Sequence, residues 1–127
     1  MAGRYRMKIV TDFAAAHLLR GYPGICSRLH GHNWQVDVEV LATQLDEIGM
    51  GMDFRDIKAA TKELIDALDH RNLNDIPPFT EINPTAENIA AFIYKGLSEK
   101  LNNEQVQVSN VTIWETERAC VSYSEER

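Results

Sequence analysis

The sequence predicts an α+β domain in which two helices pack on one face of a four-stranded antiparallel sheet. Three observations predict it: one segment alternates strictly between apolar and polar residues, two segments carry apolar stripes at helical spacing, and two strands precede the helices while two follow them. A chain of 127 residues has the length of one domain, so we expect a single domain over residues 1–127.

The two N-terminal strands are predicted at about residues 5–15 and from residue 32 onward. The first holds Ile9 and Val10 ahead of an alanine run. In the second, positions 35, 37 and 39 are polar, whereas the even positions carry His32, Trp34, Val36, Val38 and Val40. Such period-two alternation is typical of a strand with one buried face in an antiparallel sheet that meets water on the other.

Two helices are predicted after the glycines at positions 49 and 51. Asp53 is the expected N-cap of the first. Its apolar stripe recurs at three- and four-residue steps through Phe54, Ile57, Thr61, Leu64, Ile65 and Leu68. A loop rich in proline and asparagine over residues 72–84 leads to Thr85, the expected N-cap of the second helix. The core face of that helix would consist of Ile89, Phe92, Ile93, Leu97 and Leu101.

Two further strands are predicted at about residues 106–115 and 120–124, joined by the tight link 116–119. Val106 and Val108 differ in parity from Val111 and Ile113, so we expect a β-bulge near residues 109–110. A sheet of this kind has two open edges, and an open edge invites pairing with another chain. The sequence therefore predicts self-association.

Composition excludes some classes of partner. Thirteen Lys and Arg against nineteen Asp and Glu give a net charge of −6, which argues against a nucleic acid or an anionic membrane as the main partner. No apolar run approaches the length of a membrane span, and the N-terminal residues lack the pattern of a signal peptide. Two cysteines are too few for a disulfide scaffold, so we expect a cytoplasmic protein.

Three histidines are placed so that they can meet at one end of the sheet. His30 and His32 are two residues apart at the start of a strand and therefore point the same way. His17 follows the first strand, which would pair with the strand of His32. Three imidazoles form a catalytic type of zinc site with one open position. Two strand histidines hydrogen-bonded at a surface remain an alternative, as does His70 or Cys26 as the third ligand.

Three other positions carry candidate chemistry. Cys26 lies four residues before His30 and could be a thiolate base or nucleophile, a fourth zinc ligand, or an inert buried thiol. Asp69 could orient the imidazole of His70 for proton transfer, or the pair could end a helix with a favourable cation. Glu115 could accept two hydrogen bonds from an amidine-like ligand edge, or be a solvated hairpin carboxylate.

Five motifs together resemble the 6-pyruvoyltetrahydropterin synthase superfamily, and most closely its branch of 6-carboxytetrahydropterin synthases of the queuosine pathway. They are Phe13-Ala-Ala-Ala-His17, Cys26-Ser-Arg-Leu-His-Gly-His-Asn33, Leu68-Asp-His-Arg-Asn-Leu-Asn-Asp75, Pro84-Thr-Ala-Glu-Asn88 and Trp114-Glu-Thr116. The resemblance extends from about residue 13 to residue 123. The three-residue spacer between Cys26 and His30 resembles the carboxy-forming branch, because pyruvoyl-forming members typically have a longer one.

The resemblance implies the tunnelling fold, in which subunits form a trimeric barrel and two trimers stack into a hexamer with active sites at subunit boundaries. It implies that zinc is bound by His17, His30 and His32. Cys26 would be the catalytic general base or acid, with Asp69 and His70 as a proton relay. Glu115 would anchor the pterin, and Thr85 with Ala86 would line its pocket; Ala86 departs from the serine or threonine common there. These implied assignments concern the residues His17, His30, His32, Cys26, Asp69, His70, Glu115, Thr85 and Ala86.

The implied substrate is a small molecule, 7,8-dihydroneopterin triphosphate. In the carboxy-forming branch the product is 6-carboxy-5,6,7,8-tetrahydropterin, released with acetaldehyde and triphosphate. The pyruvoyl-forming reaction eliminates triphosphate without cleaving the side chain and is the nearer alternative. A non-catalytic oligomer, in which Cys26 closes a structural zinc site, is the alternative from another class.

Overall fold

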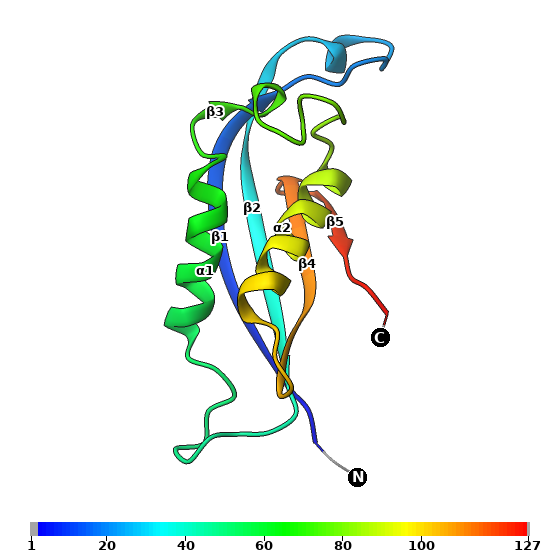
Figure 1. Cartoon of the computed structure of the whole chain (residues 1–127). Coiled ribbons are helices and arrows are strands. Elements are labelled where there is room, and N and C mark those ends of the chain that lie inside the picture. Colours follow the sequence, from blue (N-terminus) through cyan, green and yellow to red (C-terminus); the bar gives the residue numbers. More distant parts are fainter. Residues whose placement is uncertain (1–2, 127) are drawn as a thin grey trace.

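The computed structural model describes residues 3–126, so residues 1, 2 and 127 of the predicted domain lie outside the described part. It is an α+β fold with both helices on one face of the sheet (Figure 1). The helices are α1 (Phe54–Asp66) and α2 (Ala86–Leu101). The strands are β1 (Tyr5–His17), β2 (His30–Ala42), β3 (Arg71–Asn72), β4 (Val106–Thr116) and β5 (Ala119–Tyr123).

The sheet has five strands in the order β3-β1-β2-β4-β5, which corrects the predicted number of four. The additional strand β3 has two residues and runs parallel to β1, where Arg71 pairs with Ala15 and Asn72 pairs with Ala16. The four longer strands pair antiparallel, as predicted. The short parallel pair ties the chain that leaves α1 to the sheet edge beside the histidine-bearing end of β1.

The β1–β2 ladder is the longest in the sheet and runs from Tyr5 opposite Ala42 to His17 opposite His30. Both strands extend two residues further toward the histidines than the sequence pattern predicts. The alternation of β2 is confirmed, because four of its even positions are completely buried against the helices: Trp34, Val36, Val38 and Val40.

A bulge in β4 lies at the predicted position. Glu39 pairs with Asn110 and Val40 pairs with Val108, so Ser109 is the extra residue. The Ser109 hydroxyl donates to the carbonyl oxygen of Glu39 across 3.2 Å. The extra residue corrects the parity, and all four predicted apolar positions of β4 are buried: Val106, Val108, Val111 and Ile113.

Both helix caps are confirmed. Asp53 accepts a hydrogen bond from the Arg55 amide at 2.8 Å, and the Thr85 hydroxyl accepts one from the Asn88 amide at 3.1 Å. Most of the predicted core faces are buried, including Ile57, Thr61, Ile65, Leu68, Ile89, Ile93 and Leu97. Phe54 is an exception, because it is the first residue of α1 and is 51% exposed.

The loop predicted over residues 72–84 contains a short 3-10 turn, Leu73–Asp75, and lies against the end of the sheet where β1 ends and β2 begins (Figure 1). Another 3-10 turn, Ile25–Ser27, lies in the loop between β1 and β2. Among the described residues, no helix combines the length and the apolarity that a bilayer crossing requires.

Candidate active site

Three imidazoles converge at one end of the sheet. The ring centroids lie 4.6 Å apart for His17 and His30, 5.2 Å for His17 and His32, and 4.9 Å for His30 and His32. One potential ligand atom from each ring, together with one from Glu115, lies within 4.8 Å of all the others. These four side chains, hereafter the histidine cluster, could therefore hold a metal ion.

The strand register explains the convergence. His17 is the direct cross-strand partner of His30, and His32 is two residues further along β2, so all three side chains leave the sheet on the same face. The buried Trp34 lies beneath them, with its ring centroid 4.9 Å from that of His17 and 5.1 Å from that of His32. The Trp34 indole donates to the Ala15 carbonyl oxygen at 3.2 Å, and this bond fixes the orientation of the ring beneath the histidines.

Backbone carbonyls orient two of the rings. The Nδ1 atom of His17 lies 2.7 Å from the Pro84 carbonyl oxygen, and that of His30 lies 2.7 Å from the Arg28 carbonyl oxygen. A carbonyl oxygen can only accept, so each Nδ1 carries the proton and each Nε2 presents a lone pair. Metal-binding histidines commonly have this second hydrogen bond. Nothing in the sequence pattern predicts these two contacts, because every residue has a carbonyl.

The environment disfavours the charged form of two of the rings. Burial lowers the pKa of His17, against the hydrogen bond to Pro84 that raises it, and the neighbouring imidazoles lower it further. Burial also lowers the pKa of His32. The Nε2 atoms of His17 and His32 are buried without a hydrogen-bond partner. Two rings that disfavour the charged form, each with a buried Nε2 atom that lacks a hydrogen-bond partner, fit a metal ion, which would supply the missing contact.

Glu115 enters the cluster from the neighbouring strand β4. Its Oε1 atom lies 3.5 Å from Nε2 of His17 and 3.4 Å from Nε2 of His32. Trp114 pairs with Cys120 and Thr116 pairs with Ala119, so Glu115 is the extra residue of a second irregularity in β4. Bulges of this kind re-aim side chains beside functional sites. The sequence pattern does not predict this proximity, although Glu115 shares the parity of the buried Ile113.

Cys26 lies outside the histidine cluster. It belongs to the turn Ile25–Ser27 in the loop that joins His17 to His30, and its side chain is half-buried. Among the described residues, the atoms close enough to share a metal come from the three histidines and Glu115 alone. Neither Cys26 nor His70 belongs to the group of side chains that could share a metal with His30 and His32.

Asp69 and His70 form a hydrogen-bonded pair beyond the end of α1. The Asp69 carboxylate accepts from the Ala14 amide at 2.9 Å and lies 3.0 Å from Nδ1 of His70. The Ala14 bond, and then the His70 bond, lower the pKa of Asp69. The His70 side chain is 82% exposed and its backbone φ is 58°. The pair is therefore preformed, but it faces away from the protein's own core.

Thr85 and Ala86 begin α2 directly after Pro84, the residue whose carbonyl orients His17. The Thr85 hydroxyl accepts from the Asn88 amide as an N-cap. Ala86 is the first residue of the helix and is partly buried against the core. Thr85 and Ala86 are thus connected to the histidine cluster through Pro84.

The chain is similar to known proteins over most of its length. A family model described as "6-pyruvoyl tetrahydropterin synthase" matches residues 6–126. The 6-carboxy-5,6,7,8-tetrahydropterin synthase of Haemophilus influenzae is 32% identical over 136 residues, covering 90% of this chain and 94% of that protein. The 6-pyruvoyl tetrahydrobiopterin synthase of Dictyostelium discoideum is 37% identical over 102 residues, covering 79% of this chain and 73% of that protein.

The fold agrees with these matches. The structure of the Caenorhabditis elegans 6-pyruvoyl tetrahydropterin synthase aligns with a TM-score of 0.87 and 28% identity, covering 98% of each chain. Sequence and fold lead to the same conclusion: this chain belongs to the 6-pyruvoyl tetrahydropterin synthase family.

Proposed function

We propose that this chain, a single domain over residues 1–127, is a zinc-dependent lyase of the cytoplasm. It converts 7,8-dihydroneopterin triphosphate to 6-carboxy-5,6,7,8-tetrahydropterin, with release of acetaldehyde and triphosphate, in queuosine biosynthesis. The observation that carries the proposal is the convergence of three imidazoles, of which His17 and His32 have buried Nε2 atoms without a hydrogen-bond partner. Family membership supports the pterin substrate.

In the proposed site, His17, His30 and His32 hold the zinc ion through their Nε2 atoms. The bonds from Nδ1 of His17 and His30 to backbone carbonyls fix the rings in the binding orientation. Bound zinc would supply Lewis-acid polarisation of the hydroxyl groups on the pterin side chain. Three histidine ligands leave a position for that substrate, which is the arrangement of catalytic zinc sites.

Proton transfer would fall to Cys26 and to the Asp69–His70 pair. We propose that Cys26 acts as the general base or acid, and that His70, held by the Asp69 carboxylate at 3.0 Å, returns a proton. Because His70 is largely exposed, it is available to a pocket on an adjacent copy of the chain. This supports an oligomer with sites at subunit boundaries, as a trimer-based barrel and hexamer would provide.

Glu115 would hold the pterin by its 2-amino and N3 edge, with Thr85 and Ala86 lining the pocket. The Glu115 carboxylate is 38% exposed, so it remains accessible to a ligand beside the zinc ligands. A carboxylate offers two acceptor oxygens to two adjacent N–H donors, which matches that edge of the pterin ring.

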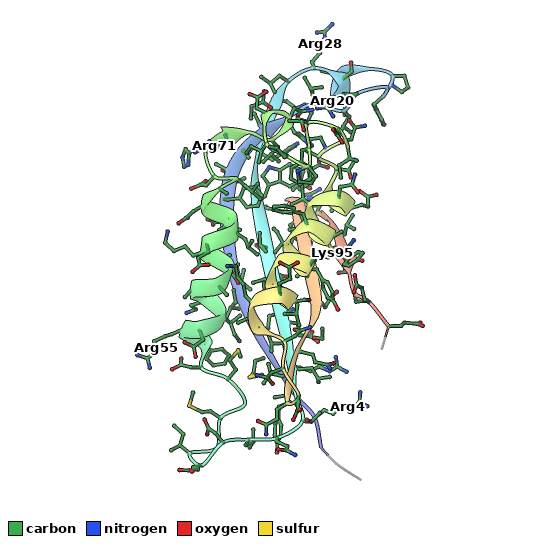
Figure 2. The ribbon with its side chains drawn as sticks, in the orientation of Figure 1. Arg4, Arg20, Arg28, Arg55, Arg71 and Lys95 are labelled. Carbon is green, nitrogen blue, oxygen red and sulfur yellow. The ribbon has the colours of Figure 1, made fainter. Side chains whose placement is uncertain are left out.

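The triphosphate needs cations in an otherwise acidic chain. Figure 2 places Arg20, Arg28 and Arg71 at the end of the molecule that carries the loop between β1 and β2. The Arg20 guanidinium is occupied, because it donates to the carbonyl oxygens of Phe79 at 2.7 Å and Ile82 at 3.3 Å. Lys8 is another cation of β1, but it is nine residues from His17, or about 30 Å at the rise of a strand, and is therefore too far away to contact the triphosphate. Arg28 and Arg71 are therefore the proposed triphosphate contacts.

The carboxy-forming reaction is favoured by the three-residue spacer between Cys26 and His30 and by the name of the H. influenzae relative. The D. discoideum relative makes the pyruvoyl-forming reaction the second candidate. Product analysis after incubation of the zinc-loaded protein with 7,8-dihydroneopterin triphosphate separates them. Acetaldehyde with triphosphate supports the proposal, triphosphate alone supports the second candidate, and neither product overturns both.

A further inference from the structure

The three residues after His17, namely Leu18, Leu19 and Arg20, follow β1 without a neighbouring strand and lead into a turn. The amide of Leu19 donates to the Cys26 carbonyl oxygen at 3.0 Å, which closes the base of the loop that carries Cys26. The backbone groups of its two neighbours, Leu18 and Arg20, are bound instead by side chains of the loop that precedes α2.

Two asparagine side chains take the place of the missing strand. The Asn74 amide group accepts from the Leu18 N–H at 2.9 Å and donates to the Leu18 carbonyl oxygen at 3.1 Å. Asn83 makes the same pair of bonds to Arg20, at 2.9 Å each. Each side chain therefore satisfies both backbone groups of one residue, as a neighbouring strand would.

The Arg20 guanidinium strengthens this contact between the two loops. It donates to the carbonyl oxygen of Phe79 at 2.7 Å and reaches those of Ile82 at 3.3 Å and Asn74 at 3.5 Å. Asn83 itself is held by its carbonyl oxygen, which accepts from the Asn88 side chain at 2.8 Å at the start of α2. The loop over residues 74–83 is thus a fixed support for the segment 18–20.

Leu19 connects this support to Cys26. Asparagine side chains hold both of its neighbours, and the Leu19 amide donates a hydrogen bond to the Cys26 carbonyl oxygen. The support is continuous with α2 through Asn83 and Asn88, so hydrogen bonds link the Cys26 carbonyl to this helix as well as to its own loop. Catalytic groups need such rigid support, since a shift of about 1 Å can cost about 10²-fold in rate.

We propose that Asn83, together with Asn74, is a positioning residue that holds Cys26 in place for the reaction. This inference rests on the proposed function for its catalytic part, whereas its structural part stands on the contacts alone. Asn83 would act through Arg20 and Leu19, and it would touch neither the substrate nor the zinc ion.

The test compares Asn83→Ala with Asn103→Ala in the full-length, zinc-loaded protein. Asn103 also accepts from two backbone amides, those of Gln105 at 2.8 Å and Val106 at 2.9 Å, but in the turn between α2 and β4 at the far end of the molecule (Figure 1). Four quantities are measured: hydrogen exchange at the Leu19 amide, zinc content, and kcat and KM for 7,8-dihydroneopterin triphosphate.

For Asn83→Ala we expect Leu19 exchange to rise at least about tenfold and kcat to fall by about 10²-fold, with KM and zinc content close to those of the unmodified protein. Asn103→Ala should leave all of these unchanged. Asn83→Asp keeps the acceptor for the Arg20 amide and loses the donor, so it should fall between the unmodified protein and Asn83→Ala. If Asn83→Ala does not fold, Asn83→Asp and Asn74→Ala decide by the same measurements.

Unchanged Leu19 exchange in Asn83→Ala would overturn the proposal, as would an equal loss of kcat in Asn103→Ala. Loss of zinc in Asn83→Ala would also overturn it, because Asn83 would then act through His17 and not through Cys26. If the unmodified protein yields no product, the proposed function fails. Leu19 exchange still decides whether Asn83 and Asn74 hold the segment 18–20 in place.

Discussion

His17 and His30 are partners in the last pair of the β1–β2 ladder, and each turns its Nδ1 toward a backbone carbonyl oxygen 2.7 Å away. The two carbonyls belong to different loops, one preceding α2 and one preceding β2. Their common effect is that both Nε2 atoms face the same point beside His32. The first prediction concerns this arrangement.

Replacement of His30 by alanine should lower zinc content and turnover together, because two imidazoles and one carboxylate would remain to bind the ion. Metal analysis of the purified variant after dialysis, alongside product formation, measures both quantities. His70→Ala removes an imidazole outside the cluster and should keep its zinc. Full zinc content in His30→Ala would contradict the three-histidine site.

Cys26→Ala should fold and retain zinc, while turnover falls by about 10²- to 10⁴-fold, the usual contribution of a general acid or base. The expectation follows from the position of Cys26 outside the group of atoms that can share a metal. Cys120→Ser, which changes the exposed cysteine of β5, is the matched control and should retain activity. If Cys26→Ala loses zinc instead, the thiol is a ligand and its assignment as base or acid is wrong.

Glu115→Gln should weaken binding of the pterin about tenfold or more and leave zinc in place, because the amide cannot accept at both positions of the ligand edge. Pterin titration followed by fluorescence, together with metal analysis, separates binding of the two partners. The distances of 3.4 and 3.5 Å from Glu115 to two imidazoles define the competing outcome. A variant that binds pterin normally but loses zinc would make Glu115 a metal ligand.

The metal-free protein should lose stability as the pH falls below about 6.5. Burial lowers the pKa of His17 and His32 in the folded chain, whereas the unfolded chain takes up these protons near 6.5. The unfolded state then binds more protons, so the free energy of unfolding falls through this window and is fully present above it. Urea unfolding of chelator-treated protein between pH 8 and pH 5.5 measures the slope, and His17→Gln should reduce it. A free energy of unfolding that is constant across this range would contradict the shifted pKa values.

Much of the fold could be predicted because the relevant signals are local. The alternation along β2, the caps at Asp53 and Thr85, and the parity change near Ser109 each arise within a few residues of sequence. The meeting of His17 with His30 and His32 follows from the same signals, since strand pairing decides which residues lie opposite each other.

What could not be predicted depends on contacts between distant segments. Strand β3 has two residues and exists because the chain after His70 meets the edge of β1, which no local pattern encodes. The Pro84 carbonyl that orients His17 is 67 residues away from it in sequence. The side chains of Asn74 and Asn83 lie 56 and 63 residues from the backbone groups that they bind, and asparagine in a loop is typical of turns as well.

The additional residue at Ser109 determines which side of the sheet each later residue of β4 faces. The pairs on either side of it differ by one position, so everything from Asn110 onward is out of phase with the valines before it. If Ser109 were instead paired as an ordinary member of the ladder, and Val106 and Val108 kept their positions, every later residue of β4 would turn to the other face and Glu115 would lie on the opposite surface. The presence of a carboxylate beside the imidazoles thus depends on a bulge six residues away.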